Sequence, residues 1–211
     1  MNIRVLIADD HAVMREGLRT LVENGAAATV VATVVNGRDA IEAAVLHHPD
    51  VVVMDISMPD MNGIEATRLI RQRCPATQVV ILSMHTSPER IHQAFAAGAT
   101  AYVLTEAASP EVLAALRAAA GGRRYVSSAI DKNNPGNTAA TAGPLASLSS
   151  RERQVLQLVV EGKSSAEIAV VVHLSPKTVE TYRSRLMKKL GVADMPALVK
   201  FAIQHGITSL D

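Results

Sequence analysis

The fold of the N-terminal half is decided by two stretches, IRVLIADDH over residues 3–11 and VVVMDISMPDMNG over residues 51–63. Each begins with a short, mostly apolar run, Ile3–Ala8 or Val51–Met54, and continues into acidic residues. Runs of this length without regular polar alternation are typical of parallel strands that are buried on both faces. Three more runs of the same kind follow at Thr29–Val35, Gln78–Leu82 and Ala101–Leu104.

Helical segments are predicted between these runs. Ser87 precedes Pro88, which places a capping serine before a proline at the first helical position, and Gly98 stands where that helix should end. Five strand–helix repeats predict an α/β domain, a (βα)5 flavodoxin-like unit whose parallel sheet has the strand order 2-1-3-4-5.

Composition excludes several classes of protein. The chain has 211 residues, 48% of them apolar, with a formal net charge of +1 and one cysteine, Cys74. A single cysteine forms neither an internal disulfide nor a zinc cage. The apolar runs are too short to span a bilayer, and the first one starts directly after Met1-Asn2. We therefore expect a soluble, cytoplasmic protein without membrane association.

The near-neutral net charge conceals a difference between the two halves. Residues 1–130 contain 11 arginines, 13 acidic residues and no lysine, whereas residues 148–211 contain 9 basic and 6 acidic residues. Between them, residues 131–147 are rich in Asn, Gly, Pro, Ala and Thr, a composition typical of a loose connection. We predict an N-terminal domain over 1–123, a flexible linker over 124–147 and a C-terminal domain over 148–211.

Polar residues follow the predicted strands, at the end of a parallel sheet where ligands bind. Asp9 and Asp10 follow the first strand, Asp55 the third, Ser83 the fourth and Thr105 the fifth. Taken singly, the aspartates could cap a helix or occupy a turn. Together they predict three converging carboxylates, which need a cation such as Mg²⁺ between them. A metal beside an exposed carboxylate suits acceptance of a phosphoryl group.

The segments VLIADDH, VVVMDISMPDMNG, VVILS and GATAYVLT resemble, in order and spacing, the receiver domain of two-component response regulators. The resemblance implies that Asp55 is the phosphoacceptor and that a sensor histidine kinase is a partner. It further implies that Ser83 is the switch hydroxyl and Tyr102 the switch aromatic, although Tyr102 could equally be a half-buried strand residue. The implied Mg²⁺ ligands are Asp9, Asp10, Asp55 and the main-chain carbonyl of Ser57.

One position departs from the receiver pattern. The family has a lysine after the fifth strand, where this chain has Thr105. The chain contains no lysine before residue 132 that could replace it. The phosphoryl group therefore lacks one expected counter-charge, unless Arg123 or Arg124 reaches it. An alternative hypothesis is a pseudo-receiver, which binds DNA independently of phosphorylation under the control of a partner or ligand.

The C-terminal segment predicts an all-α domain of four helices. Ser149-x-x-Glu152 and Ser164-x-x-Glu167 are capping-box patterns, and Ser175-Pro176 starts a longer helix that ends at Gly191. A short helix, a tight turn and a longer basic helix form a helix-turn-helix pattern. In the longer helix, Val179, Leu186 and Leu190 form the inner stripe. Its basic outer face could contact phosphates or simply be solvated.

The sequence from 148 to 206 resembles the LuxR-type DNA-binding domain of NarL/FixJ response regulators. The resemblance implies double-stranded DNA as a partner and binding as a homodimer, with pairing through the final helix, Pro196 to His205. Glu180 could accept a hydrogen bond from cytosine or repel phosphate. The residues implied to contact bases or backbone are Lys177, Thr178, Glu180, Thr181, Arg183, Ser184, Arg185, Lys188 and Lys189.

The sequence thus predicts a transcription regulator whose receiver controls dimerisation and promoter binding, and it predicts no enzymatic activity. A phosphatase with an aspartate nucleophile would need Asp-x-Asp after the first strand, whereas in this chain the two aspartates are adjacent. A nucleotide-binding enzyme would need a glycine-rich turn, and neither G-x-G-x-x-G nor a P-loop occurs. The histidines, His11 among them, have no metal-ligand spacing.

Overall fold

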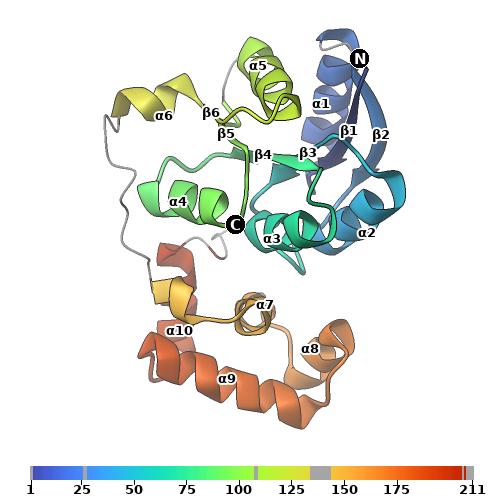
Figure 1. Ribbon diagram of the computed structural model, residues 1–211. Helices are drawn as coiled ribbons and strands as arrows, with labels where there is room; N and C mark the ends of the chain where they lie inside the picture. Colours follow the sequence, from blue (N-terminus) through green and yellow to red (C-terminus); the bar gives the residue numbers. More distant parts are fainter. Residues whose placement is uncertain (1, 26–27, 107–108, 134–143, 206, 208–211) are drawn as a thin grey trace. The chain divides into compact units, whose positions relative to one another are not determined.

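A computed structural model describes residues 2–25, 28–106, 109–133, 144–205 and 207 (Figure 1). The chain divides into two compact units, Met1–Ala140 and Thr141–Asp211, which are described separately. Within the described residues, no helix is both long and apolar enough to cross a membrane.

The N-terminal unit is built on a six-stranded parallel sheet with the order β2-β1-β3-β4-β5-β6. Its strands are β1 (Ile3–Ala8), β2 (Ala28–Val34), β3 (Val51–Asp55), β4 (Gln78–Ser83), β5 (Ala101–Leu104) and β6 (Tyr125–Val126). The predicted order 2-1-3-4-5 is confirmed for the first five strands, and the predicted runs match their bounds to within one residue. The sequence prediction of five strands was incomplete, because it lacked β6.

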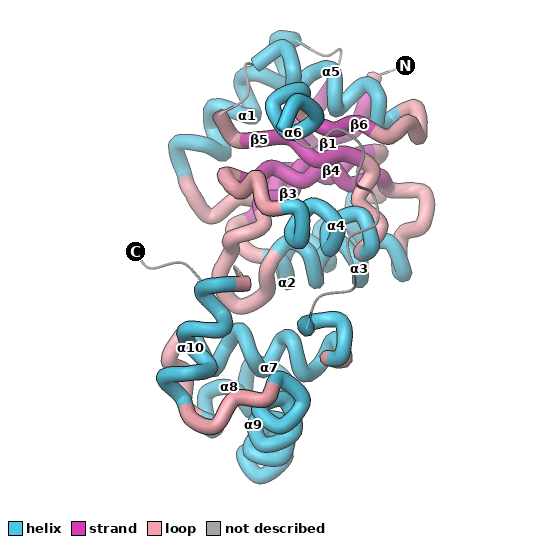
Figure 2. The backbone as a smooth tube through the Cα atoms, turned by 90° about the vertical axis from the view of Figure 1, so that its left-hand side faces the viewer, coloured by secondary structure: helices cyan, strands magenta, loops and turns pink. Residues whose placement is uncertain are grey.

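Helices cover both faces of the sheet (Figure 2). One face carries α1 (Ala12–Gly25) and α5 (Ser109–Ala120), and the other carries α2 (Gly37–His47), α3 (Gly63–Arg73) and α4 (Pro88–Ala96). Successive strand residues alternate between the two cores: Val5 and Ile7 pack with α1 and α5, whereas Leu6 and Ala8 pack with α2 and α3. Burial on both faces explains why the strands are continuous apolar runs in the sequence.

Residues 124–133 continue the N-terminal unit past residue 123, the predicted domain boundary. β6 pairs in parallel with β5, and α6 (Ser128–Asn133) follows it. Glu111 of α5 holds this extension, since its carboxylate accepts from the Ser127 hydroxyl at 2.8 Å and the Ser128 amide at 2.7 Å. The segment predicted as linker, 124–147, therefore contains β6, α6 and the 3-10 helix η1 (Pro144–Ser147). Residues 134–143 lie outside the described residues, so a flexible linker there stays a prediction.

The C-terminal unit contains the four predicted helices, α7 (Ser150–Val160), α8 (Ser165–Val172), α9 (Pro176–Leu190) and α10 (Met195–Gln204). Both predicted capping boxes form, Ser149 with Glu152 and Ser164 with Glu167. Each box satisfies helix-end amides that would otherwise lack a partner. The helices enclose an apolar core that includes Leu156, Ile168, Val179, Leu186 and Leu198.

Candidate functional site

The predicted site residues of the N-terminal unit converge at the carboxyl end of the sheet. β1 is hydrogen-bonded between β2 and β3, so Asp9, which follows β1, lies beside the end of β3, where Asp55 stands. On the other side of β3, Asp55 is in register with Leu82, next to Ser83 of β4. The amide of Thr105 donates to the carbonyl of Ser83 at 2.9 Å, which places Thr105 at the same end of β5.

Asp9, Asp10 and His11 form a compact group after β1. Their candidate ligand atoms all lie within 4.8 Å of one another. His11 Nδ1 lies 3.0 Å from Asp10 and 3.5 Å from Asp9, whose carboxylate also accepts from the His11 amide at 2.7 Å. Asp9 is only 4% exposed, whereas Asp10 and His11 are exposed. His11 was not predicted as part of this site, because its position beside the two carboxylates depends on the turn after β1.

The carboxyl group of Asp55 is strongly affected by this neighbourhood. Burial, and after it the negative charges of Asp9 and Asp10, raise the pKa of Asp55 to about 6. Hydrogen bonds from the amides of Ile56 and Ser57 oppose the shift, the latter at 3.1 Å from Ser57 N to Asp55 Oδ2. Burial likewise raises the pKa of Asp9. Raised pKa values at a cluster of acids are characteristic of functional sites.

Gly63, at the start of α3, lies close against the backbone of Asp55. A Cβ atom at this position would lie 2.0 Å from the Asp55 carbonyl oxygen and 2.8 Å from the Met54 side chain. The Gly63 amide donates to the carbonyl of Ile56 at 3.0 Å, which fixes the loop that leaves β3. The sequence places this glycine at the end of the 51–63 motif without indicating its steric role, which depends on the path of that loop.

Ser83 and Tyr102 lie together beside this acidic group. Ser83 is buried, and its hydroxyl accepts from the His85 amide at 3.1 Å. Tyr102 is fully buried rather than half-buried, and its hydroxyl donates to the His85 carbonyl at 2.9 Å. Burial raises the pKa of Tyr102, while a side-chain hydrogen bond with Ser83 opposes that shift. The loop after β4 is therefore tied at His85 to both predicted switch residues.

The two arginines considered as replacements for the missing lysine do not enter the site. Arg123 and Arg124 are both exposed. The Arg124 guanidinium lies 3.7 Å from the centre of the Phe95 ring on α4, a cation–π contact outside the acidic group. Glu106, the residue after Thr105, is exposed as well, so it adds no buried negative charge to the acidic group.

In the C-terminal unit, α9 presents its polar side to solvent. Val179 and Leu186 of the predicted inner stripe are fully buried, and Leu190 is partly buried. Lys177, Glu180, Thr181, Ser184, Arg185 and Lys188 are exposed. Within the described part of the chain, Lys177, Arg185 and Lys188 have no side-chain hydrogen bond or ion pair. The turn before α9 depends on His173, whose left-handed backbone (φ 52°) ends α8.

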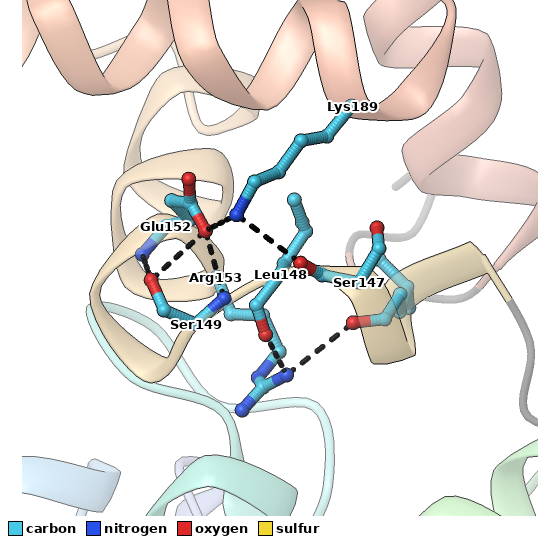
Figure 3. Close-up of polar contacts among 7 residues, drawn as sticks. Ser147, Leu148, Ser149, Glu152, Arg153 and Lys189 are labelled. Atoms are coloured by element: carbon cyan, nitrogen blue, oxygen red, sulfur yellow. Dashed lines mark hydrogen bonds and ion pairs between the residues drawn. The ribbon is translucent and has the colours of Figure 1, made fainter.

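Two of the basic residues implied to contact DNA are engaged within the unit itself. Lys189 Nζ donates to Glu152 Oε2 at 2.7 Å and to the carbonyl of Ser147 at 3.2 Å (Figure 3). Glu152 is 4% exposed; burial raises its pKa, but hydrogen bonds from Lys189 and Ser149 outweigh this effect and keep the pKa below its usual value. Arg183 donates to the Ser165 hydroxyl at 3.0 Å. Both side chains thus join α9 to the neighbouring helices.

Comparison with protein families matches each unit separately. Residues 5–117 match the response regulator receiver domain, and residues 146–202 match the bacterial regulatory proteins of the luxR family. The chain belongs to the NarL/FixJ family of response regulators. The regulator carries a receiver followed by a LuxR-type DNA-binding domain. The family comparison gives no support to the alternative of a pseudo-receiver.

Relatives extend over almost the whole regulator. It is 36% identical to the transcriptional regulatory protein MctR of Rhizobium johnstonii, covering 98% of this chain and 96% of MctR. It is 35% identical to the response regulator UvrY of Escherichia coli, covering 99% and 97%. The structure of RcsB from Salmonella enterica bound to promoter rprA with the phosphomimetic BeF3- is 27% identical, covers 95% of this chain and 98% of that one, and has a TM-score of 0.66.

Proposed function

We propose that the regulator accepts a phosphoryl group on Asp55, and that this event controls its dimerisation and its binding to promoter DNA through α9. The observation that carries the proposal is the position of Asp55. Its carboxylate stands at the end of β3 beside Asp9 and Asp10, with Ser83 and Thr105 at the ends of the next two strands. Transfer to Asp55 requires that these groups hold the negatively charged oxygens of the incoming phosphoryl group in position.

The acidic group suits a magnesium ion. Asp9, Asp10 and Asp55 offer carboxylate oxygens, the ligand type that Mg²⁺ prefers. The raised pKa of Asp55 reflects burial first and then the negative charges of Asp9 and Asp10, which a cation would neutralise. His11 offers nitrogen, which is poorly matched to this ion, so we assign it to orienting Asp9 and Asp10. When bound, the ion would neutralise charge on the transferring oxygens.

The other partners follow from the family. A sensor histidine kinase would supply the phosphoryl group to Asp55, and a homodimer would bind double-stranded DNA with one α9 helix in each half-site. RcsB supports this view, since its solved structures include two dimers bound to two parallel DNAs. The exposed Lys177, Arg185 and Lys188 would contact phosphates, and the shorter Thr181 and Ser184 would approach base edges.

Phosphorylation of the full-length protein tests the proposal directly. Incubation with acetyl phosphate and Mg²⁺ should add one phosphoryl group, measured by intact mass spectrometry, and Asp55→Asn should abolish the addition. Duplexes selected from a random-sequence library should then bind the phosphorylated protein more tightly than the Asp55→Asn variant. An equal affinity of the two forms would contradict the regulatory part of the proposal, and persistent phosphorylation of the variant would contradict Asp55 as acceptor.

A further inference from the structure

The acceptor site needs a positive charge that β5 does not provide. A phosphoryl group brings about −1.5 to −2 charges into a site that already holds Asp9 and Asp10. Thr105 occupies the position where the family places a lysine, and residues 1–130 contain none. Of the two permanently charged basic residue types, residues 1–130 contain only arginine, so the candidate replacements are the arginines of the other elements.

Among the receiver arginines with a described side-chain contact, most contact groups outside the acceptor site. Arg117 donates to the carbonyl of Gly25, and Arg71 donates to the carbonyl of Pro75. Arg19 pairs with Glu23 on the surface of α1. Arg15 is the nearer rival, since it donates to the main-chain carbonyl of Asp9 at 2.8 Å. That contact is made to a main-chain oxygen after β1, on the opposite side of β3 from Ser83 of β4.

Arg90 has a different position. It lies in the first turn of α4, the helix that follows the loop from Ser83, and it is only 5% exposed. Its amide donates to the capping hydroxyl of Ser87 at 3.3 Å. In the same loop, the His85 carbonyl accepts from Tyr102 of β5 and the His85 amide donates to Ser83, so α4 starts three residues after a position that contacts both side chains.

Charge interactions connect Arg90 to the acceptor. Burial lowers the pKa of Arg90, whereas electrostatic interactions with Tyr102 and Asp55 raise it, and the positive charge of Arg90 contributes, after burial, to the lowered pKa of His85. Arginine remains charged at working pH, and its planar fork of N–H donors matches phosphate oxygens. A buried guanidinium in the first turn of α4, at the end of the loop that leaves Ser83, is therefore suited to the role that a lysine after β5 would perform.

We propose that Arg90, reaching the site from α4, supplies the counter-charge for the phosphoryl group on Asp55 that Thr105 does not supply. This inference rests on the proposed function of Asp55 as acceptor. It also makes α4 a part of the acceptor site, so that the phosphoryl group would pull on the helix that borders Ser83 and Tyr102.

A double-mutant cycle tests the inference in the full-length protein. Arg90→Met removes the charge but keeps the apolar stem, Thr105→Lys restores the family residue, and the double variant combines them. We expect Arg90→Met to lower the initial rate of phosphorylation by acetyl phosphate about tenfold or more, the effect of losing a charged hydrogen bond. In the Thr105→Lys background the same change should cost about twofold or less, because the lysine replaces the arginine.

Two further measurements separate this role from a structural one. Equilibrium binding of beryllofluoride with Mg²⁺, followed by ¹⁹F NMR, should weaken in Arg90→Met and recover in Arg90→Lys. Arg19→Met, which removes one surface charge of the receiver, should leave both the rate and beryllofluoride binding unchanged. An equal loss from Arg90→Met in both backgrounds, or loss in Arg15→Met in place of Arg90→Met, would overturn the inference.

The outcomes also distinguish the inference from the function on which it rests. Absence of both phosphorylation and beryllofluoride binding in the wild-type protein would overturn the proposed function and the role of Arg90 together. Normal phosphorylation of the wild type with no loss in Arg90→Met would overturn the role of Arg90 alone.

Discussion

The charged residues of the receiver site and those of α9 differ in their surroundings. Asp9 and Arg90 are almost completely buried at the carboxyl end of the sheet, whereas Lys177, Arg185 and Lys188 stand in solvent. Burial raises the pKa values of Asp9 and Asp55 and lowers that of Arg90. In a buried cluster one added charge acts strongly on its neighbours, while an exposed row of cations contributes many small, salt-screened contacts.

Because the receiver site is buried and the polar face of α9 is exposed, we expect the receiver site to tolerate steric change less well than α9. Gly63→Ala would place a Cβ atom 2.0 Å from the Asp55 carbonyl oxygen, so the loop after β3 must move. We expect a loss of about 3 kcal/mol or more in the free energy of unfolding, measured by urea denaturation, together with loss of phosphorylation.

Gly17 provides a matched control for that substitution. A Cβ atom at Gly17 would meet nothing within 4 Å, and this glycine lies inside α1. Gly17→Ala should therefore stabilise the protein by about 0.5–1 kcal/mol. Equal effects of the two substitutions would show that the close approach of α3 to Asp55 does not constrain the site.

Burial of Asp55 predicts a pH dependence of stability. Because its pKa is raised from 3.8 to about 6 in the fold, the folded state binds the proton more tightly than the unfolded state. The free energy of unfolding should therefore fall as pH rises through the window from about 4 to about 6, by about 2–3 kcal/mol in the absence of Mg²⁺. Asp55→Asn should lack this component.

The measurement is the difference between the variant and the wild type in urea denaturation with EDTA. The two proteins should be nearly equally stable below about pH 4, and the variant should be more stable at pH 7–8. Mg²⁺ should reduce the difference, since an ion would stabilise the ionised site. Parallel pH curves would contradict the raised pKa of Asp55.

In α9, the neighbouring residues Lys188 and Lys189 should behave differently. Lys189 contacts the buried Glu152, so Lys189→Met should lower the free energy of unfolding of the C-terminal unit by about 1 kcal/mol. The expected loss of stability is small because the Lys189 side chain is partly exposed to solvent. Thermal unfolding of the full-length protein would measure it, and Lys188→Met should leave the transition unchanged.

The smallest effect is expected on DNA affinity. Lys188→Met should weaken binding to a mixed-sequence duplex several-fold and reduce the slope of log affinity against log salt by about 1, while Lys189→Met should change the slope less. Fluorescence anisotropy over a series of salt concentrations checks this. A larger change of slope in Lys189→Met would show that its contact with Glu152 yields to phosphate.

The sequence predicted those parts of the molecule that local patterns determine. Buried parallel strands are continuous apolar runs, and a capping box needs only four consecutive residues, so β1 to β5 and the starts of α7 and α8 were predicted. The convergence of Asp9, Asp55 and Ser83 followed from the strand order. The roles of these residues remain predictions that the experiments above address.

The features that escaped prediction depend on distant parts of the chain. β6 is two residues long and is a strand because it pairs with β5, not because its sequence alternates. Arg90 resembles any charged residue in a first helical turn until α4 is packed beside Tyr102. Lys189 looks like one more basic residue of α9, and only the fold brings it to Glu152.

β6 also determines where a receiver fragment can be cut. It forms a parallel ladder with Ala101 and Tyr102 of β5, and the Ser127 amide donates to the carbonyl of Tyr102 at 2.9 Å. A fragment that ended at residue 117, where the receiver match ends, would leave β5 as an open edge strand. Open edges pair with other chains, so such a fragment should aggregate or swap strands, whereas one that continues through residue 133 keeps the two-residue β6 as a short edge beside β5.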